Sequence, residues 1–129
     1  TIKGKRILLV EDNELNAEIA KTVLEDVGAL ITRAENGQQA LELFKEKPAG
    51  TFDVILMDLM MPVMDGIAAT KAIRAMDRAD AKTIPIIAMT ANAFAEDVQA
   101  ALNAGMDDHV AKPVDMSILI SVITKHIER

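Results

Sequence analysis

The sequence has no cysteine, tryptophan or tyrosine, and its only aromatic side chains are three phenylalanines. Without cysteine, the chain can form neither a disulfide bond nor a reactive thiolate. No apolar run approaches the ~20 residues that a membrane-spanning helix needs. The formal charge is −6, from 20 acidic and 14 basic side chains, which argues against a broad basic surface for nucleic acid or an anionic membrane.

The 129 residues are enough for one domain, which we expect to extend over residues 1–129 with its core over about 5–128. Short apolar runs alternate with segments whose apolar residues have helical spacing, and residues 77–83 are predicted to form a polar loop. The predicted strands are 6–10, 30–34, 54–58, 84–89 and 109–111, and the predicted helices are 14–27, 39–45, 67–76, 95–104 and 116–127. This alternation predicts a parallel sheet with helices on both faces and right-handed crossovers.

Polar side chains follow four of the predicted strands, at the edge where parallel strands end and ligands bind. The third apolar run stops at Asp58, and the following Asp65-Gly66 pair favours a loop before the next helix. The other strand ends are followed by Glu11 and Asp12, by Thr90, and by Lys112. Each of these residues taken singly is more often a cap, a turn residue or a surface charge. Their joint placement at one edge favours a functional site.

This group of side chains suits phosphoryl chemistry. Crowded carboxylates are unfavourable unless a cation neutralises them, and oxygen ligands with few carboxylates favour Mg²⁺. A carboxylate beside Mg²⁺ can attack phosphorus and form an aspartyl phosphate. Lys112 supplies a point charge, Thr90 a hydroxyl donor, and the small Ala91 leaves room for an incoming donor.

At these positions the sequence resembles the receiver domains of two-component response regulators, over essentially its whole length. The motifs that carry the resemblance are Glu11-Asp12, Met57-Asp58-Leu59-Met60-Met61-Pro62-Val63-Met64-Asp65-Gly66, Thr90-Ala91 and Lys112-Pro113. The resemblance implies a flavodoxin-like (βα)5 fold, doubly wound, with a five-stranded parallel sheet in the order 2-1-3-4-5.

The resemblance also implies a role for each residue of the site. Asp58 would accept a phosphoryl group from a phosphohistidine on a partner. Asp12, Asp58 and the backbone carbonyl of Met60 would bind Mg²⁺, with Mn²⁺ as the alternative cation, and Glu11 would act through a water molecule. Thr90 and Lys112 would hold phosphoryl oxygens, with Ala91 beside them.

Further implied features concern regulation. Lys112-Pro113 would be a cis peptide, and Met60 and Asn92 would tune hydrolysis of the phosphoryl group. Movement of Thr90 would bias a two-state surface formed by the helix 95–104, the strand 109–111 and the last helix. His109 stands where receivers often carry Tyr or Phe; we keep it as a candidate switch residue, although an ordinary imidazole at a sheet edge is the simpler interpretation.

The runs Glu11-Asp12-Asn13 with Asn16, and Met89-Thr90-Ala91-Asn92-Ala93, are similar to receivers of hybrid histidine kinases and phosphorelays. Because the chain begins at Thr1 and carries no effector segment, we expect the receiver of a hybrid kinase rather than a stand-alone regulator. The expected partner is a histidine kinase or a histidine phosphotransfer domain, which would dock near Leu15 and Asn16. We expect a cytoplasmic phosphoacceptor, monomeric or weakly dimeric when phosphorylated, that is not an enzyme.

Three other classes of protein share some of these features. Mg²⁺-dependent phosphohydrolases of the haloacid dehalogenase type carry an Asp-x-Asp motif. Here Asp58 is the first acid of such a motif, and Met60 stands where the second acid would be. A flavin or nucleotide module would need a glycine-rich loop and aromatic side chains. A pseudo-receiver that acts only as a scaffold is disfavoured by the intact acidic set.

Two expectations concern packing. Met57 is expected in the core, whereas the loop methionines are left open. Ile118 is expected to face inward from the last helix and His126 to lie at the surface.

Overall fold

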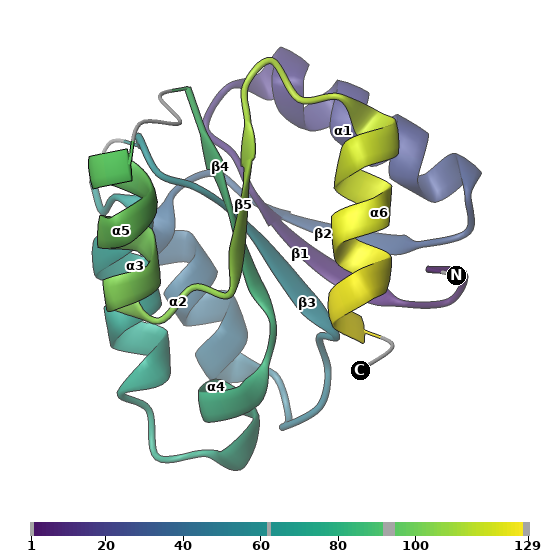
Figure 1. Cartoon of the computed structure of the whole chain (residues 1–129). Helices are drawn as coiled ribbons and strands as arrows, with labels where there is room; N and C mark the ends of the chain where they lie inside the picture. Colours follow the sequence, from purple (N-terminus) through teal and green to yellow (C-terminus); the bar gives the residue numbers. More distant parts are fainter. Residues whose placement is uncertain (1, 62, 92–94, 128–129) are drawn as a thin grey trace.

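The computed structural model describes residues 2–61, 63–91 and 95–127, and in these ranges a five-stranded parallel sheet forms the centre of the molecule (Figure 1). The strands are β1 (Arg6–Val10), β2 (Leu30–Ala34), β3 (Val54–Asp58), β4 (Ile86–Thr90) and β5 (Asp108–Ala111). Their order is β2-β1-β3-β4-β5, and all neighbouring pairs are parallel. The flavodoxin-like sheet and its strand order are therefore confirmed.

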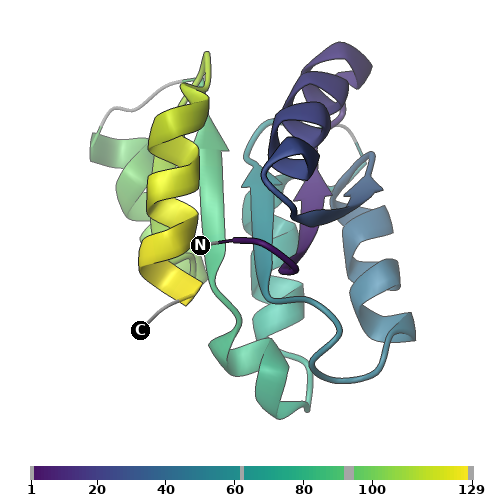
Figure 2. The same cartoon turned by 90° about the vertical axis from the view of Figure 1, so that its right-hand side faces the viewer.

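Helices cover both faces of this sheet. They are α1 (Glu14–Asp26), α2 (Gly37–Glu46), α3 (Gly66–Arg74), α4 (Ala79–Thr83), α5 (Ala95–Ala104) and α6 (Met116–Ile127). Figures 1 and 2 show α1 and α6 on one face of the sheet and α2, α3 and α5 on the other. No helix in the described ranges is both long and apolar enough to cross a membrane.

The core consists of two aliphatic layers, one on each side of the sheet. All five residues of β3 and of β4 are buried, as expected for strands covered on both faces. Met57 is fully buried in the layer beneath α2 and α3, which confirms its predicted core position. Leu24, Leu119 and Ile123 bring α1 and α6 onto the opposite layer.

The segment predicted as a polar loop contains the short helix α4. The Arg78 side chain binds both carboxylate oxygens of Asp80, at 2.9 and 2.8 Å, and also donates to the backbone carbonyl of Phe44. Ala81 is fully buried within the turn. The loop prediction was wrong because these contacts join segments that are distant in sequence. The following strand begins at Ile86 rather than Ile84, since Ile84 ends α4 and Pro85 has no N–H to donate.

Two predictions about the last helix were also wrong. His126 is buried, because its Nε2 lies 2.9 Å from Oδ2 of Asp108 at the start of β5. Ile118 is 55% exposed and points away from the core. Asp115 does cap this helix, since its Oδ1 accepts from the backbone N–H groups of Ser117 and Ile118.

Candidate functional site

The carboxyl edge of the sheet brings three carboxylates together. Glu11 follows β1, Asp12 follows Glu11, and Asp58 is the last residue of β3, which pairs directly with β1. One ligand atom from each of these three side chains lies within 4.8 Å of the others. Glu11 and Asp58 are buried, whereas Asp12 is exposed at the mouth of the site. The predicted acidic cluster is therefore present, with one side open to solvent.

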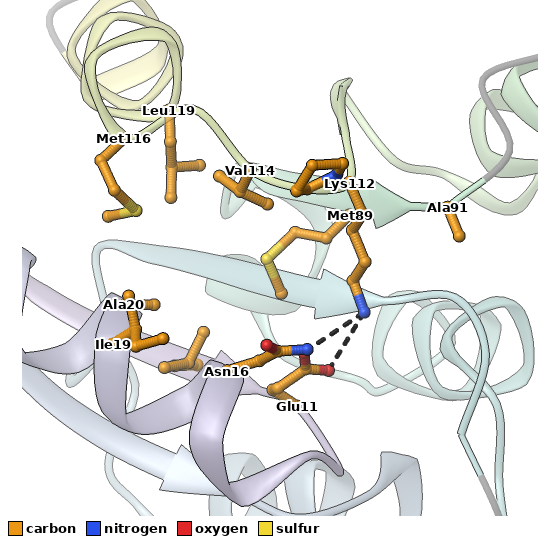
Figure 3. Close-up of a pocket in the computed structure, with 12 residues that line it drawn as sticks. Glu11, Asn16, Ile19, Ala20, Met89, Ala91, Lys112, Val114, Met116 and Leu119 are labelled. Carbon is orange, nitrogen blue, oxygen red and sulfur yellow. Dashed lines mark hydrogen bonds and ion pairs between the residues drawn. The ribbon is translucent and has the colours of Figure 1, made fainter.

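Lys112 follows the edge strand β5, and its side chain extends across the end of β4 to this cluster. Its Nζ lies 2.9 Å from Oδ2 of Asp58. It also donates to Oε1 and Oε2 of Glu11 at 3.2 and 3.3 Å (Figure 3). Lys112 and Glu11 are 101 positions apart in the sequence. The ammonium group offsets the charge of two buried carboxylates, which would otherwise repel each other.

Electrostatics at the site are shifted in a way that follows from burial. Burial and the adjacent Asp58 raise the pKa of Glu11 from 4.5 to about 7. Burial acts to raise the pKa of Asp58 as well, but hydrogen bonds from Glu11 and Lys112 outweigh it, so that the pKa of Asp58 falls below its ordinary value. Asp58 is therefore the first of the two carboxyl groups to ionise as the pH rises, and an anionic carboxylate is the form that a nucleophile requires.

The backbone around Asp58 is closely constrained. The Met60 N–H donates to Asp58 Oδ1 at 3.2 Å, and the Gly66 N–H donates to the Leu59 carbonyl at 3.2 Å. A Cβ atom on Gly66 would lie 2.3 Å from the Asp58 carbonyl oxygen, so only glycine fits at this position. The Asp-Gly pair predicted as a turn signal thus holds α3 against the end of β3.

Thr90 and Ala91 lie at the end of β4, next to β3. Thr90 is buried, and its carbonyl accepts from the Lys112 N–H at 2.7 Å, which ties the ends of β4 and β5 together. The Lys112–Pro113 peptide bond is cis, the conformation implied by the resemblance. Ala91 is exposed and, with Lys112, lines a cavity of about 480 Å³ between α1 and α6 (Figure 3). The rest of this cavity is mainly apolar, with contributions from Ile19, Met89, Val114, Met116 and Leu119.

The remaining predicted residues have different surroundings. The His109 side chain, on β5, is 37% exposed, and Met60 is 77% exposed beside Asp58. Asn92 lies outside the described residues. One supporting residue was missed: the Arg33 guanidinium donates to the Glu11 carbonyl at 2.9 Å from β2. A charged residue within a short β-strand was the only sequence signal for it.

Comparison with known proteins identifies the class. Residues 7–124 match the family described as the response regulator receiver domain. Hybrid signal transduction histidine kinase I of Dictyostelium discoideum is 40% identical over an alignment of 125 residues that covers 95% of this chain and 7% of that protein. The receiver domain of sensor histidine kinase PA1611 from Pseudomonas aeruginosa PAO1 is 38% identical, with a TM-score of 0.88 and coverage of 98% of this chain and 99% of that one.

A third relative was solved with a partner. The receiver domain of the response regulator Ssk1 of Saccharomyces cerevisiae, in complex with the histidine phosphotransfer protein Ypd1, is 32% identical, with a TM-score of 0.85 over 98% of this chain and 90% of that one. This chain belongs to the response regulator receiver domain family. It is a phosphoacceptor domain of two-component phosphorelay signalling, homologous to receivers of hybrid histidine kinases. It spans only a small part of the hybrid kinase that it matches.

The acidic cluster fits a hard divalent cation. Glu11, Asp12 and Asp58 offer only oxygen ligands, and the exposed Asp12 leaves room for the water molecules that Mg²⁺ retains. The PA1611 receiver was solved with a magnesium ion coordinated in its active site cleft. Receivers pair with histidine kinases or phosphotransfer proteins, as the Ypd1–Ssk1 complex illustrates.

Proposed function

We propose that Asp58 accepts a phosphoryl group from a phosphohistidine of a histidine kinase or histidine phosphotransfer domain. An Asp58 carboxylate oxygen forms the new bond to phosphorus as the bond between phosphorus and the imidazole nitrogen breaks. The imidazole keeps the bonding electron pair and takes up a proton. The observation that carries this proposal is the buried Asp58 carboxylate, which has a lowered pKa and lies 2.9 Å from the Lys112 ammonium group.

The neighbouring side chains have proposed roles that follow from their positions. The Lys112 ammonium group, which pairs with the Asp58 carboxylate, pairs with a phosphoryl oxygen after transfer. Thr90 donates a hydrogen bond to a second phosphoryl oxygen. Asp12, Asp58 and the Met60 carbonyl would hold Mg²⁺, or Mn²⁺ in its place, and Glu11 would act through a water molecule. When bound, the cation neutralises charge on the transferred phosphoryl group. Ala91 leaves space for the donor.

Regulation and context extend the proposal. Met60 and Asn92 tune hydrolysis of the phosphoryl group. When Asp58 is phosphorylated, Thr90 and His109 move and change the conformation of the surface formed by α5, β5 and α6. Residues 1–129 act as one domain of a hybrid sensor kinase, with a stand-alone regulator as the alternative. The domain carries out only its own phosphorylation and dephosphorylation, in the cytoplasm, as a monomer or a weak phosphorylation-dependent dimer that does not bind nucleic acid. The docking surface for the donor includes α1, where Leu15 is 69% exposed.

The test is the intact mass of the chain after incubation with acetyl phosphate, with and without Mg²⁺. We expect one added phosphoryl group that requires Mg²⁺ and is lost in Asp58→Asn. The matched control is Asp26→Asn, since Asp26 is exposed at the end of α1, far from the cluster. An adduct that persists in Asp58→Asn, or no adduct when rapid hydrolysis has been excluded, would refute the proposal. Steady turnover of a small phosphomonoester would instead support a phosphohydrolase.

A further inference from the structure

The loop between β3 and α3 contains an unusual backbone conformation at Val63. Its φ is +68°, in the left-handed region, which a β-branched residue rarely adopts. Val63 is the only non-glycine residue with positive φ in the described parts of the chain. Glycine or asparagine would suit this conformation better, so the backbone does not account for valine at this position.

Packing does not account for it either. The Val63 side chain is 83% exposed, and its neighbour in the loop, Met60, is 77% exposed. By contrast, Met61 and Met64 pack against the core on the α2 and α3 side. The loop therefore turns two large apolar side chains inward and presents two others to solvent, immediately after the phosphoacceptor.

Hydrogen bonds hold the described residues that follow Val63 in this loop. Gly37 N–H, at the start of α2, donates to the Met64 carbonyl at 2.9 Å, and a Cβ atom on Gly37 would lie 2.4 Å from that oxygen. Asp65 caps α3 by accepting from the Ala68 N–H at 2.8 Å. At the base of the loop the Gly66 N–H reaches the Leu59 carbonyl. These contacts hold Val63 in its strained conformation and fix the direction of its side chain.

The position of Val63 indicates what it contacts. The Asp58 side chain is only 3% exposed, so a phosphohistidine reaches it only if the donor protein covers the rim of the site. Val63 is three residues from Gly66 at the base of the loop, a reach of at most about 11 Å. A protein interface of ordinary size covers about 800 Å² on each partner, or roughly 16 Å around its centre. Val63 therefore falls within the area that a donor centred on Asp58 would cover.

From these observations we infer that Val63 is an apolar contact for the protein that donates the phosphoryl group, and that it selects a protein donor over a small one. The inference rests on the proposed function and deepens it. The donor presents an apolar side chain beside its phosphohistidine, because a polar one would be desolvated against Val63 and Met60 without a partner. In the complex, burial of this valine against the donor offsets the cost of its unfavourable backbone conformation.

The experiment compares two donors that break the same phosphorus–nitrogen bond. Phosphoimidazole has no protein surface, whereas a phosphorylated histidine phosphotransfer protein has one. The protein donor used is the one that transfers fastest to the unmodified chain in a panel that includes Ypd1. In Val63→Asn, we expect transfer from the protein donor to slow about tenfold, as loss of one apolar interface anchor commonly does. Transfer from phosphoimidazole should be unchanged, and the unfolding midpoint should be equal or higher, because asparagine tolerates positive φ.

Two control variants complete the design. Val63→Ile keeps the apolar contact and should retain transfer from the protein donor. Val27→Asn makes the same substitution at another exposed valine, 43% exposed at the end of α1 and at the opposite edge of the sheet. It should leave transfer from both donors unchanged.

Each other outcome overturns the inference. Transfer from the protein donor within twofold of the unmodified chain would mean that Val63 makes no such contact. An equal loss with both donors would place Val63 in the reaction site itself. A changed oligomeric state with unchanged transfer would assign it to a contact between copies. An unmodified chain that accepts from phosphoimidazole but no faster from any protein would exclude docking, whereas one that accepts from neither donor would overturn the proposed function as well.

Discussion

Replacing Glu11 by glutamine should stabilise the folded chain at high pH in the absence of divalent cations. Glu11 is buried beside Asp58, and its pKa in the folded state is about 7 against an ordinary 4.5. The charged form is therefore disfavoured by folding. Below pH 4.5 Glu11 is protonated in both the folded and the unfolded chain, and folding carries no cost from its charge. This stability is lost as the pH rises through 7, the pKa of Glu11 in the folded state.

The size of the effect follows from this difference in pKa. A carboxyl group whose pKa rises from 4.5 to about 7 on folding destabilises the folded state by about 3 kcal/mol at pH 8 and by less than about 1 kcal/mol at pH 5. Glutamine has the shape of the protonated acid and can still donate a hydrogen bond to Asp58. We therefore expect Glu11→Gln to gain about 2 kcal/mol more stability at pH 8 than at pH 5.

The assay is urea unfolding of both proteins in EDTA, at several pH values between 5 and 8. Glu18→Gln is the matched control, since Glu18 is exposed on α1. It should show the same change in stability at every pH. If Glu11→Gln changed stability equally at pH 5 and pH 8, or lost stability as the pH rose, Glu11 would already be charged in the folded state and the reasoning would be refuted.

Three further predictions concern contacts that hold the site together. Lys112→Met should lower the unfolding free energy by about 3 kcal/mol without divalent cations, because it leaves the buried Asp58 without its counter-charge. Gly66→Ala should lower it by at least about 2 kcal/mol, since its Cβ would meet the Asp58 carbonyl oxygen at 2.3 Å. Asp108→Asn should lower it by about 1–2 kcal/mol at pH 7, because Asp108 binds His126, and by much less near pH 2. Urea unfolding measures all three.

The sign of the last prediction follows from the pKa of Asp108. Burial acts to raise that pKa, but hydrogen bonds from His126 and from the His109 N–H outweigh it and lower the pKa below 3.8. The stabilisation is thus present above about pH 4 and is lost as the pH falls through the folded-state pKa. A destabilisation by Asp108→Asn that grew on acidification would contradict this prediction.

For Gly66→Ala the control is Gly50→Ala, where nothing lies within 4 Å of an added Cβ and only the positive φ opposes the change.

Much of the fold was predictable because its signals are local. The apolar runs of β1, β3 and β4 and the helical spacing between them are set by neighbours in the sequence, and they predicted the layers and the parallel sheet. The site residues were also predictable in kind. Parallel strands end at one edge, so Glu11, Asp58 and Lys112 had to meet there once the order of the strands was known.

Features that depend on distant contacts were not predictable. α4 forms because the Arg78 side chain reaches the Phe44 carbonyl, 34 positions away. His126 is buried because of Asp108, although its place near the end of an amphipathic helix indicates a surface residue. Arg33 supports the Glu11 backbone from a neighbouring strand, and nothing in its own neighbourhood specifies that partner.

The sequence by itself determined the class of protein and the chemical groups of its site, because strand and helix periodicity and the residues at strand ends are written in consecutive positions. Only the tertiary structure decided how those groups are charged and presented. The raised pKa of Glu11 needs burial beside Asp58, and the outward direction of Val63 needs a loop held by Gly37 and Gly66. Burial and backbone strain depend on which distant segments come into contact, and those contacts exist only in the folded chain.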